Sequence, residues 1–187
     1  MSVPTIAMTR EEFERLVLED PDRPWEIIRG QLREKPAMSF AHNYGSLELR
    51  DLLRDQLDRS RYYVSVNLAR LHNPRDTYVI PDVVVIPIDM TAGLRARPRS
   101  VEIYVDPVPL VAEYLSPSTG KYDVEGKLEA YKERGDREIW IVHPDDRWLT
   151  AWRRRPDGTY GELTIRSGTI TPIALPTVTI PLEAILV

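Results

Sequence analysis

The chain has 187 residues, 42% of them hydrophobic, and a formal net charge of -4. This length and apolar content predict a single domain over residues 1–187, while the acidic balance argues against a broad basic surface for nucleic acid. The absence of cysteine excludes disulfides and thiolate metal sites, and the lack of a long apolar stretch or secretion signal predicts a cytoplasmic protein with no membrane partner.

The first part of the chain predicts two helices separated by short strands. A capping-box pattern followed by an apolar stripe predicts a helix over residues 9–20. Residues 25–36 read as two short strands about a turn at Arg29 and Gly30. From residue 39 to about residue 59, leucines recur at helical spacing among many charges, which indicates an amphipathic helix packed on a sheet.

The middle of the chain predicts β-structure followed by a loop. Residues 61–71 alternate well enough for a strand, and residues 73–76 have the composition of a turn. The run over 78–86 is expected to pair with the first strand as a hairpin. Residues 87–107 are rich in proline and arginine without a clear period, so they are predicted to form a loop.

The second half predicts a strand, helix, strand unit. Residues 108–116 read as a buried strand, 124–135 as a helix ending at a glycine, and 138–144 as another strand. Short joints between these elements predict parallel strands with a right-handed crossover. Residues 147–165 then predict a hairpin about a Pro-Asp-Gly turn, and the proline-rich tail is expected to pack back on the core.

Two carboxylates interrupt apolar runs that otherwise read as core strands. Asp82 lies within "TYVIPDVVVIPID", and Glu113 lies within "PLVAEYLSPS". Burying a carboxylate is costly, and two that meet in one site repel each other unless a cation or a shared proton intervenes. A divalent metal such as Mg²⁺ is the simplest compensation, because it takes oxygen ligands and needs only one or two protein carboxylates. The alternative is that each carboxylate forms a salt bridge with an arginine or caps the end of a neighbouring strand.

The order of these motifs resembles a known family of nucleases. The segments "WEIIRGQL", "IPD", "AEYLSPST" and "YDVEGKLEAYKERGDREIWIVHP" are similar to the PD-(D/E)XK restriction-endonuclease-like superfamily, and specifically to its Uma-two-type endonuclease family. The resemblance implies an α/β restriction-endonuclease-like fold, with a mixed central β-sheet flanked by helices and additional β-hairpins. It also implies a homodimer that hydrolyses phosphodiester bonds of nucleic acid, DNA in the first place, with Mg²⁺ as cofactor and Mn²⁺ as a substitute.

The resemblance also assigns the site residues. Asp82 and Glu113 would bind the metal, and Glu26 would complete the site or orient water. The superfamily's lysine is expected two residues after the glutamate, where this chain has Leu115. In this branch a lysine on the following helix takes over, and the matching residue is Lys127. We therefore expect Glu26, Asp82, Glu113 and Lys127 to face one cleft.

Helical geometry alone does not single out Lys127. Lys132 flanks the other side of the same apolar stripe, and Lys121 precedes the helix, so both stay open on the residues alone. His42 matches a histidine of the family that could hydrogen-bond the substrate or the site. A structural hydrogen bond at the start of the helix is its alternative role.

Other chemistries find less support. The stretch "SPSTGKY" lacks the first glycine and the serine or threonine of a phosphate-binding loop. The histidines form no zinc-binding doublet, and the run 153–155 indicates a solvated turn rather than a DNA contact. Because Leu115 replaces the motif lysine, a noncatalytic dimeric or DNA-binding scaffold of the same fold is the competing function.

Overall fold

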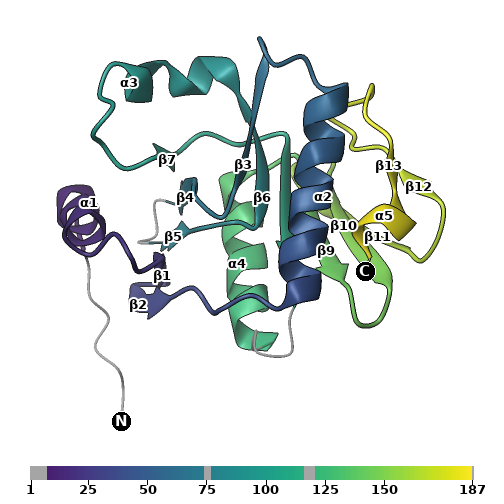
Figure 1. Cartoon of the computed structure of the whole chain (residues 1–187), viewed down its shortest axis with the longest axis horizontal. Helices are drawn as coiled ribbons and strands as arrows, with labels where there is room; N and C mark the ends of the chain where they lie inside the picture. Colours follow the sequence, from purple (N-terminus) through teal and green to yellow (C-terminus); the bar gives the residue numbers. More distant parts are fainter. Residues whose placement is uncertain (1–7, 74–76, 116–120, 187) are drawn as a thin grey trace.

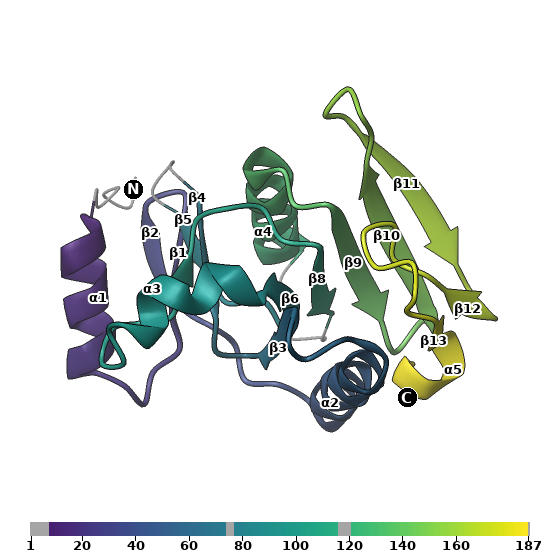
Figure 2. The same ribbon diagram turned by 90° about the horizontal axis from the view of Figure 1, so that it is seen from above.

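Two β-sheets, with helices around them, make up the part of the chain that the computed structural model describes, which is residues 8–73, 77–115 and 121–186. In Figure 1 the smaller sheet lies toward the N-terminal helix and the larger sheet occupies the middle of the molecule. Figure 2 shows helices α2 and α4 on opposite sides of the larger sheet. The result is a three-layered body in which the larger sheet is covered on both faces.

The smaller sheet has five strands, and its order departs from the order of the chain. In space the strands are β2 (Gln31–Glu34), β1 (Trp25–Ile28), β5 (Thr77–Val79), β4 (Arg70–Asn73) and β7 (Ile103–Tyr104). Only the β4–β7 pair is parallel. The predicted hairpin over residues 25–36 is confirmed, with positive φ angles at Arg29 (52°) and Gly30 (73°) in its turn.

The larger sheet has six strands and supplies most of the core. In space the strands are β11 (Tyr160–Ile165), β10 (Trp148–Arg154), β9 (Glu138–His143), β8 (Leu110–Tyr114), β6 (Val83–Pro87) and β3 (Tyr62–Val66). The parallel pair is β8–β9, joined by helix α4 (Lys121–Arg134), and its other neighbours are antiparallel. The predicted strand, helix, strand unit and the hairpin that follows it are therefore confirmed.

The hairpin predicted over residues 61–86 is divided between the two sheets. Its outer parts, β3 and β6, pair in the larger sheet, and its inner parts, β4 and β5, pair in the smaller one. The breaks fall at Asn67, whose φ is 53°, and at Pro81, which has no N–H to donate. Both residues interrupt the ladder of backbone hydrogen bonds between the strands. The alternation of apolar residues alone predicts that this ladder continues. The prediction of one continuous hairpin was wrong for this reason, and residues 74–76 of its turn lie outside the described residues.

The segment over residues 87–107 was predicted as a loop, and this was wrong in part. It contains a 3₁₀ turn (Ile88–Thr91), the short helix α3 (Ala92–Arg95) and strand β7. Tyr104 of β7 is buried, and its hydroxyl donates to Glu102. Strand β7 forms by pairing with β4. A strand of two residues is too short to show a periodicity in the sequence.

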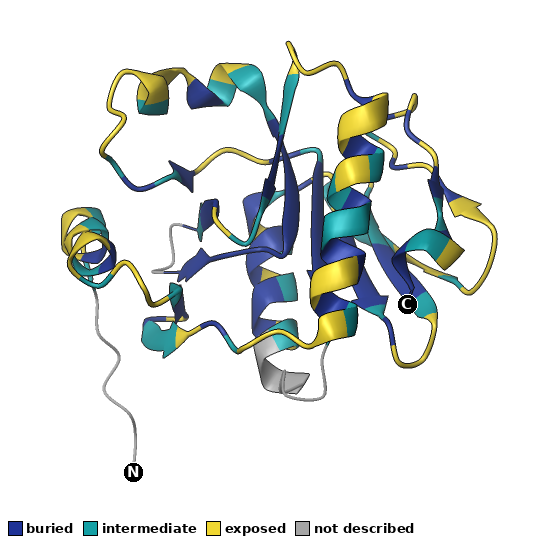
Figure 3. Cartoon of the chain, in the orientation of Figure 1, coloured by how far each residue is buried: buried dark blue, intermediate teal, exposed yellow. Residues whose placement is uncertain are grey.

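Helices α1 (Arg10–Glu19) and α2 (Phe40–Gln56) form where capping and apolar spacing predict them. Thr9 closes the capping box of α1, and the Ser39 side chain accepts from the third residue of α2. Figure 3 shows that α1 and α2 turn exposed faces outward and buried faces toward the sheets. None of the described helices is long and apolar enough to span a membrane.

The two faces of the larger sheet have separate cores. One core lies between the sheet and α2, where Leu49 and Leu53 meet Val83 and Val85. The other lies between the sheet and α4, where Tyr131 meets Val84. The tail, with β12 (Thr169–Ile170), β13 (Ile180–Pro181) and α5 (Leu182–Ile185), packs into the first core as predicted. Residues of β6 therefore alternate strictly between the two helices.

Candidate active site

The pairing of β6 with β8 brings the two interrupting carboxylates together. Val83 pairs with Ala112, and continuing this antiparallel register by one residue sets Asp82 opposite Glu113. Since side chains alternate along a strand, Glu113 lies on the face on which α4 packs, whereas Asp82, directly before β6, is also within reach of His42 on α2. Like charges directly opposite each other on a sheet are destabilising, so this site needs cations to offset them.

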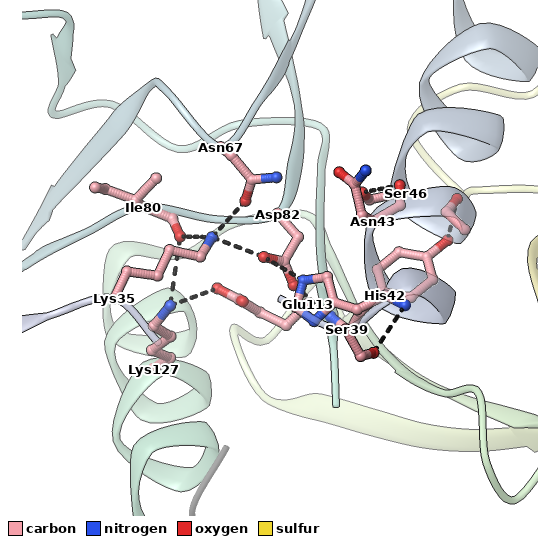
Figure 4. Close-up of polar contacts among 12 residues, drawn as sticks. Lys35, Ser39, His42, Asn43, Ser46, Asn67, Ile80, Asp82, Glu113 and Lys127 are labelled. Atoms are coloured by element: carbon pink, nitrogen blue, oxygen red, sulfur yellow. Dashed lines mark hydrogen bonds and ion pairs between the residues drawn. The ribbon is translucent and has the colours of Figure 1, made fainter. Parts of the chain in front are cut away.

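Lys35 and His42 surround the Asp82 carboxylate from two other elements. Lys35 Nζ lies 2.7 Å and His42 Nε2 lies 2.9 Å from Asp82 Oδ1, and both side chains are buried. Asp82 Oδ2 accepts a hydrogen bond of 2.6 Å from the backbone N–H of Tyr114. Lys35 follows β2 and His42 lies in the first turns of α2, so the smaller sheet and α2 both contribute to holding Asp82 (Figure 4).

Lys127 of α4 connects Glu113 with Glu26. Its ammonium lies 2.8 Å from Glu26 Oε1 and 3.4 Å from Glu113 Oε1. The hydroxyl of Tyr131, one turn further along α4, donates to Glu113 Oε1. Each carboxylate therefore has an ammonium partner. The salt-bridge partners are lysines rather than the arginines that the alternative invoked.

The peptide of Ile80 holds both lysines in place. Its carbonyl oxygen accepts from Lys35 Nζ at 2.8 Å and from Lys127 Nζ at 3.3 Å. Its N–H donates to Glu26 Oε1 at 2.7 Å. Because Ile80 directly follows β5 of the smaller sheet and Asp82 directly precedes β6 of the larger one, the site lies at the junction of the two sheets (Figure 4).

The two carboxyl groups have opposite pKa shifts despite similar burial. Burial raises the pKa of Asp82, but the positive charge of Lys35, the contact with His42 and the charge of Lys127 outweigh it, so its pKa falls below the ordinary value. Burial raises the pKa of Glu113 to about 7, and Lys127 offsets this only in part. Asp82 is thus held as a carboxylate, while Glu113 can take up a proton near neutral pH.

Lys127 keeps its charge although it is buried. Burial lowers its pKa, but the carboxylates of Glu113, Glu26 and Asp82 outweigh this effect and raise its pKa above the ordinary value. A cation that stays protonated can stabilise negative charge in its surroundings at any physiological pH.

The charged groups line a small cavity of about 30 Å³. A cavity of this size is large enough to hold at least one water molecule. The residues that line it are Glu26, Ile28, Arg33, Glu34, Lys35, Pro36, Ala37, His42, Asp82, Glu113, Tyr114 and Lys127. The segment that follows β2 thus forms one wall, opposite the carboxylates of the larger sheet.

The donor set fits a hard divalent cation. Asp82 Oδ1 is buried and, within the described ranges, has ion-pair contacts but no partner in hydrogen-bond geometry. The contacts described for Glu113 all use Oε1, which leaves Oε2 for a ligand. Residues 8–73, 77–115 and 121–186 contain no group of three or more potential ligand side chains arranged for a metal. Two carboxylates with water molecules suit Mg²⁺, which keeps much of its hydration shell.

The other candidates from the sequence lie apart from this cavity or outside the described side chains. Lys132 Nζ lies 3.5 Å from the centre of the Trp152 ring, on the far side of α4's apolar stripe. Leu115, at the position of the motif lysine, packs against the core on the α4 face. The side chain of Lys121 lies outside the described residues. Arg153 pairs with Glu138 and donates to a backbone carbonyl, which is a structural role.

Sequence reasoning missed Lys35, Tyr131 and Tyr114. Lys35 follows an edge strand in "LREKP", where a lysine normally faces solvent. Tyr131 was recognised only as part of the apolar stripe of its helix, and Tyr114 contributes a backbone N–H that any residue would supply. A buried tyrosine hydroxyl does need a partner, so the position of Tyr131 one turn from Lys127 was the one available signal.

A solved structure has the same architecture. The chain superimposes on the "Crystal structure of a putative nuclease belonging to DUF820 from Anabaena variabilis ATCC 29413" with a TM-score of 0.78 and 16% sequence identity, covering 96% of this chain and 97% of that one. No curated protein matches the chain. At this identity the likeness establishes the fold, which is the restriction-endonuclease-like α/β fold with a mixed sheet flanked by helices.

The family follows from the sequence over nearly its whole length. The family model described as "Uma2: Putative restriction endonuclease" matches residues 10–183. The chain therefore belongs to the Uma2 family. This confirms the resemblance drawn from the "IPD" and "AEYLSPST" segments and supports a nuclease function.

Proposed function

We propose that this protein is a metal-dependent endonuclease that hydrolyses phosphodiester bonds of DNA, with Mg²⁺ as cofactor and Mn²⁺ as a substitute. The observation that carries the proposal is the meeting of Asp82, Glu113 and Lys127 in one buried cavity. They come from two neighbouring strands and the helix that crosses them. The family supports nuclease chemistry, and the donor set supports the metal.

Asp82 and Glu113 would hold the metal. When bound, the ion would supply Lewis-acid polarisation of the phosphate and lower the pKa of a coordinated water. Asp82 is suited to bind a cation because its lowered pKa keeps it ionised. Glu113 must lose its proton to ligate, and with its pKa raised to about 7 by burial it can do so near neutral pH.

Lys127 would stabilise the negative charge that develops on the phosphate oxygens as water attacks phosphorus and a P–O ester bond breaks. Glu26 would act as a positioning residue, because its Oε1 lies 2.8 Å from the ammonium and also accepts from the Ile80 N–H. Fixed charges aimed at the reacting group cost little reorganisation during the reaction, which makes such stabilisation effective.

Cleavage of single-stranded, duplex and branched DNA, with RNA beside them, tests the proposal. The assays use Mg²⁺ or Mn²⁺, and Asp82→Asn should lose cleavage in all of them. Lys127→Ala should also lose cleavage. Lys132→Ala is the matched control, because it makes the same substitution on the same helix beside Trp152 and should cleave like wild type.

Metal binding has a separate readout in thermal unfolding. At a metal concentration a hundred times the dissociation constant, linkage stabilises the wild type by about 2.7 kcal/mol, which moves the melting midpoint by several degrees. Asp82→Asn should show almost no shift. Lys127→Ala should keep a shift, because its assigned role is in the transition state. A wild-type midpoint that neither ion moves would contradict the metal-dependent reading.

A noncatalytic scaffold of the same fold is the competing proposal. Leu115 replaces the motif lysine, and the cavity is small and lined by carboxylates that already have lysine partners. The scaffold reading predicts nucleic-acid binding without cleavage of any substrate under either metal. A homodimer belongs to both proposals, and light scattering at micromolar concentration checks it through the molecular mass.

A further inference from the structure

Lys35 has the same number of oxygen contacts as its ammonium has protons. Its Nζ lies 2.7 Å from Asn67 Oδ1, 2.8 Å from the carbonyl oxygen of Ile80 and 2.7 Å from Asp82 Oδ1. Only 7% of its side chain is exposed. The ammonium therefore occupies an enclosed, oxygen-lined position of the kind that a small cation would take.

We propose that Lys35 is the internal counter-cation of Asp82 in the metal-free protein, and that it sets how tightly the site binds a divalent metal. This inference rests on the proposed function, because it assumes that Asp82 is a metal ligand. A metal and the ammonium compete for one carboxylate, and as like charges they also repel each other. In the metal-bound protein Lys35 would keep its contacts with Asn67 and Ile80 and lose the one with Asp82.

Crowding around one oxygen of the Asp82 carboxylate makes this competition direct, because Lys35 at 2.7 Å and His42 at 2.9 Å both contact Oδ1. Three groups are in contact with this carboxylate, namely Lys35 and His42 at Oδ1 and the Tyr114 N–H at Oδ2. The Tyr114 contact is a backbone hydrogen bond of 2.6 Å within the sheet, so it is not easily released. Lys35 is the member of the set that carries a full positive charge on a flexible stem.

Lys127 does not compete to the same degree. Its shorter contact is with Glu26 at 2.8 Å, and its distance to Glu113 is 3.4 Å. The two lysines therefore have different roles at the site. Lys127 is held in place mainly by Glu26, whereas Lys35 directly contacts Asp82, a proposed metal ligand.

Isothermal titration of the full chain with Mn²⁺ tests the proposal. Lys35→Met keeps an apolar stem of similar length and removes the charge. It should bind Mn²⁺ at least about tenfold more tightly than wild type, since an adjacent unit charge typically changes such equilibria by one to three powers of ten. Lys132→Met is the control and should bind as wild type does, because its ammonium lies over Trp152. Metal-free Lys35→Met should also melt at a lower temperature, and added Mn²⁺ should raise its midpoint more than that of wild type.

The outcomes separate this inference from the function on which it rests. Wild-type binding with unchanged or weaker binding by Lys35→Met would overturn the inference alone, and would leave Lys35 as a structural anchor or a transition-state group. Binding by Lys35→Met but not by wild type would support it. Absence of binding in both proteins would overturn the metal-dependent function and this inference together. If Lys35→Met does not fold, Lys35→Gln removes the charge while keeping a polar group for Asn67 and Ile80, and the same expectations apply.

Discussion

Asp82, directly before β6, lies opposite Glu113 of β8; the two are 0% and 5% exposed, yet their ionisation differs. Asp82 has Lys35 at 2.7 Å and His42 at 2.9 Å, and its pKa is lowered despite burial. Glu113 shares Lys127 with Glu26 at a longer distance, and burial raises its pKa to about 7. Burial is the same cost for both groups, so the distance to a dedicated cation decides which one stays charged.

Removing the negative charge of Asp82 should cause the largest loss of stability. Asp82→Asn leaves Lys35 buried without its counter-charge, and breaking a buried pair in this way costs about 3–5 kcal/mol. Urea unfolding of the metal-free protein should therefore show a clear loss of stability. A variant as stable as wild type would mean that the Lys35 contact does not stabilise Asp82 in solution.

A smaller effect should come from disturbing the backbone contact of Asp82. A Cβ added at Gly45 would lie 2.6 Å from Tyr114 Cε1 and 2.8 Å from the Ile185 carbonyl oxygen. Gly45→Ala should displace Tyr114, whose N–H binds Asp82, and cost about 2 kcal/mol. Gly93→Ala is the control, since its Cβ would meet nothing within 4 Å. Equal urea midpoints for the two variants would contradict this account.

On the Glu113 side, Tyr131→Phe removes the hydroxyl that donates to Oε1. Hydrogen bonds to charged groups contribute about 1.5 kcal/mol or somewhat more, and a loss of about that size is expected in chemical unfolding at pH 8, where Glu113 is ionised. Tyr44→Phe, at an exposed tyrosine, should leave the midpoint unchanged. A loss of stability as large as that of Asp82→Asn would contradict the proposed difference between the surroundings of Asp82 and Glu113.

The smallest effect should be that of Glu113→Gln at pH 5, below about 1 kcal/mol, because a protonated carboxyl and an amide are similar in shape and charge. Since folding raises the pKa of Glu113 from 4.5 to about 7, the native state binds the proton more tightly than the unfolded state does. Its contribution to stability is therefore complete below about pH 4.5 and is lost as the pH rises through 7.

Urea unfolding of both proteins from pH 5 to pH 8 measures this difference. The wild type should lose stability relative to Glu113→Gln as the pH rises, because Gln does not titrate. Asp82 has the opposite sign, since its contribution is present above the ordinary pKa and is lost as the pH falls through the lowered one. A difference between wild type and Glu113→Gln that stays constant with pH would show that Glu113 titrates normally.

The sequence predicted the larger sheet better than the smaller one, and the reason is physical. Strands β8 and β9 are apolar runs on either side of a helix. Such a unit almost always forms two parallel strands of one sheet joined by a right-handed crossover. The smaller sheet depends on a break at Pro81 and on a strand of two residues, β7, and neither has a periodicity to detect. Local pattern therefore identifies elements, but not which sheet each element joins.

The same limit applies to the site. Asp82 and Glu113 were visible because a charge inside an apolar run conflicts with its surroundings, and the resemblance supplied Glu26 and Lys127. Lys35 follows an edge strand and reaches the site only because that strand belongs to the other sheet. A contact made across two sheets leaves no trace in the spacing of residues.

The location of the site at the junction of the sheets also limits how the protein can be divided. Glu26 and Lys35 come from the smaller sheet and its flank, Asp82 and Glu113 from the larger sheet, and Lys127 from a helix, with the Ile80 peptide between them. No contiguous fragment shorter than the span from residue 26 to residue 127 contains all five side chains. If the chain is cut anywhere within this span, neither piece contains all five charged side chains. The complete set of ion pairs can therefore form only when the two pieces reassemble into the whole fold.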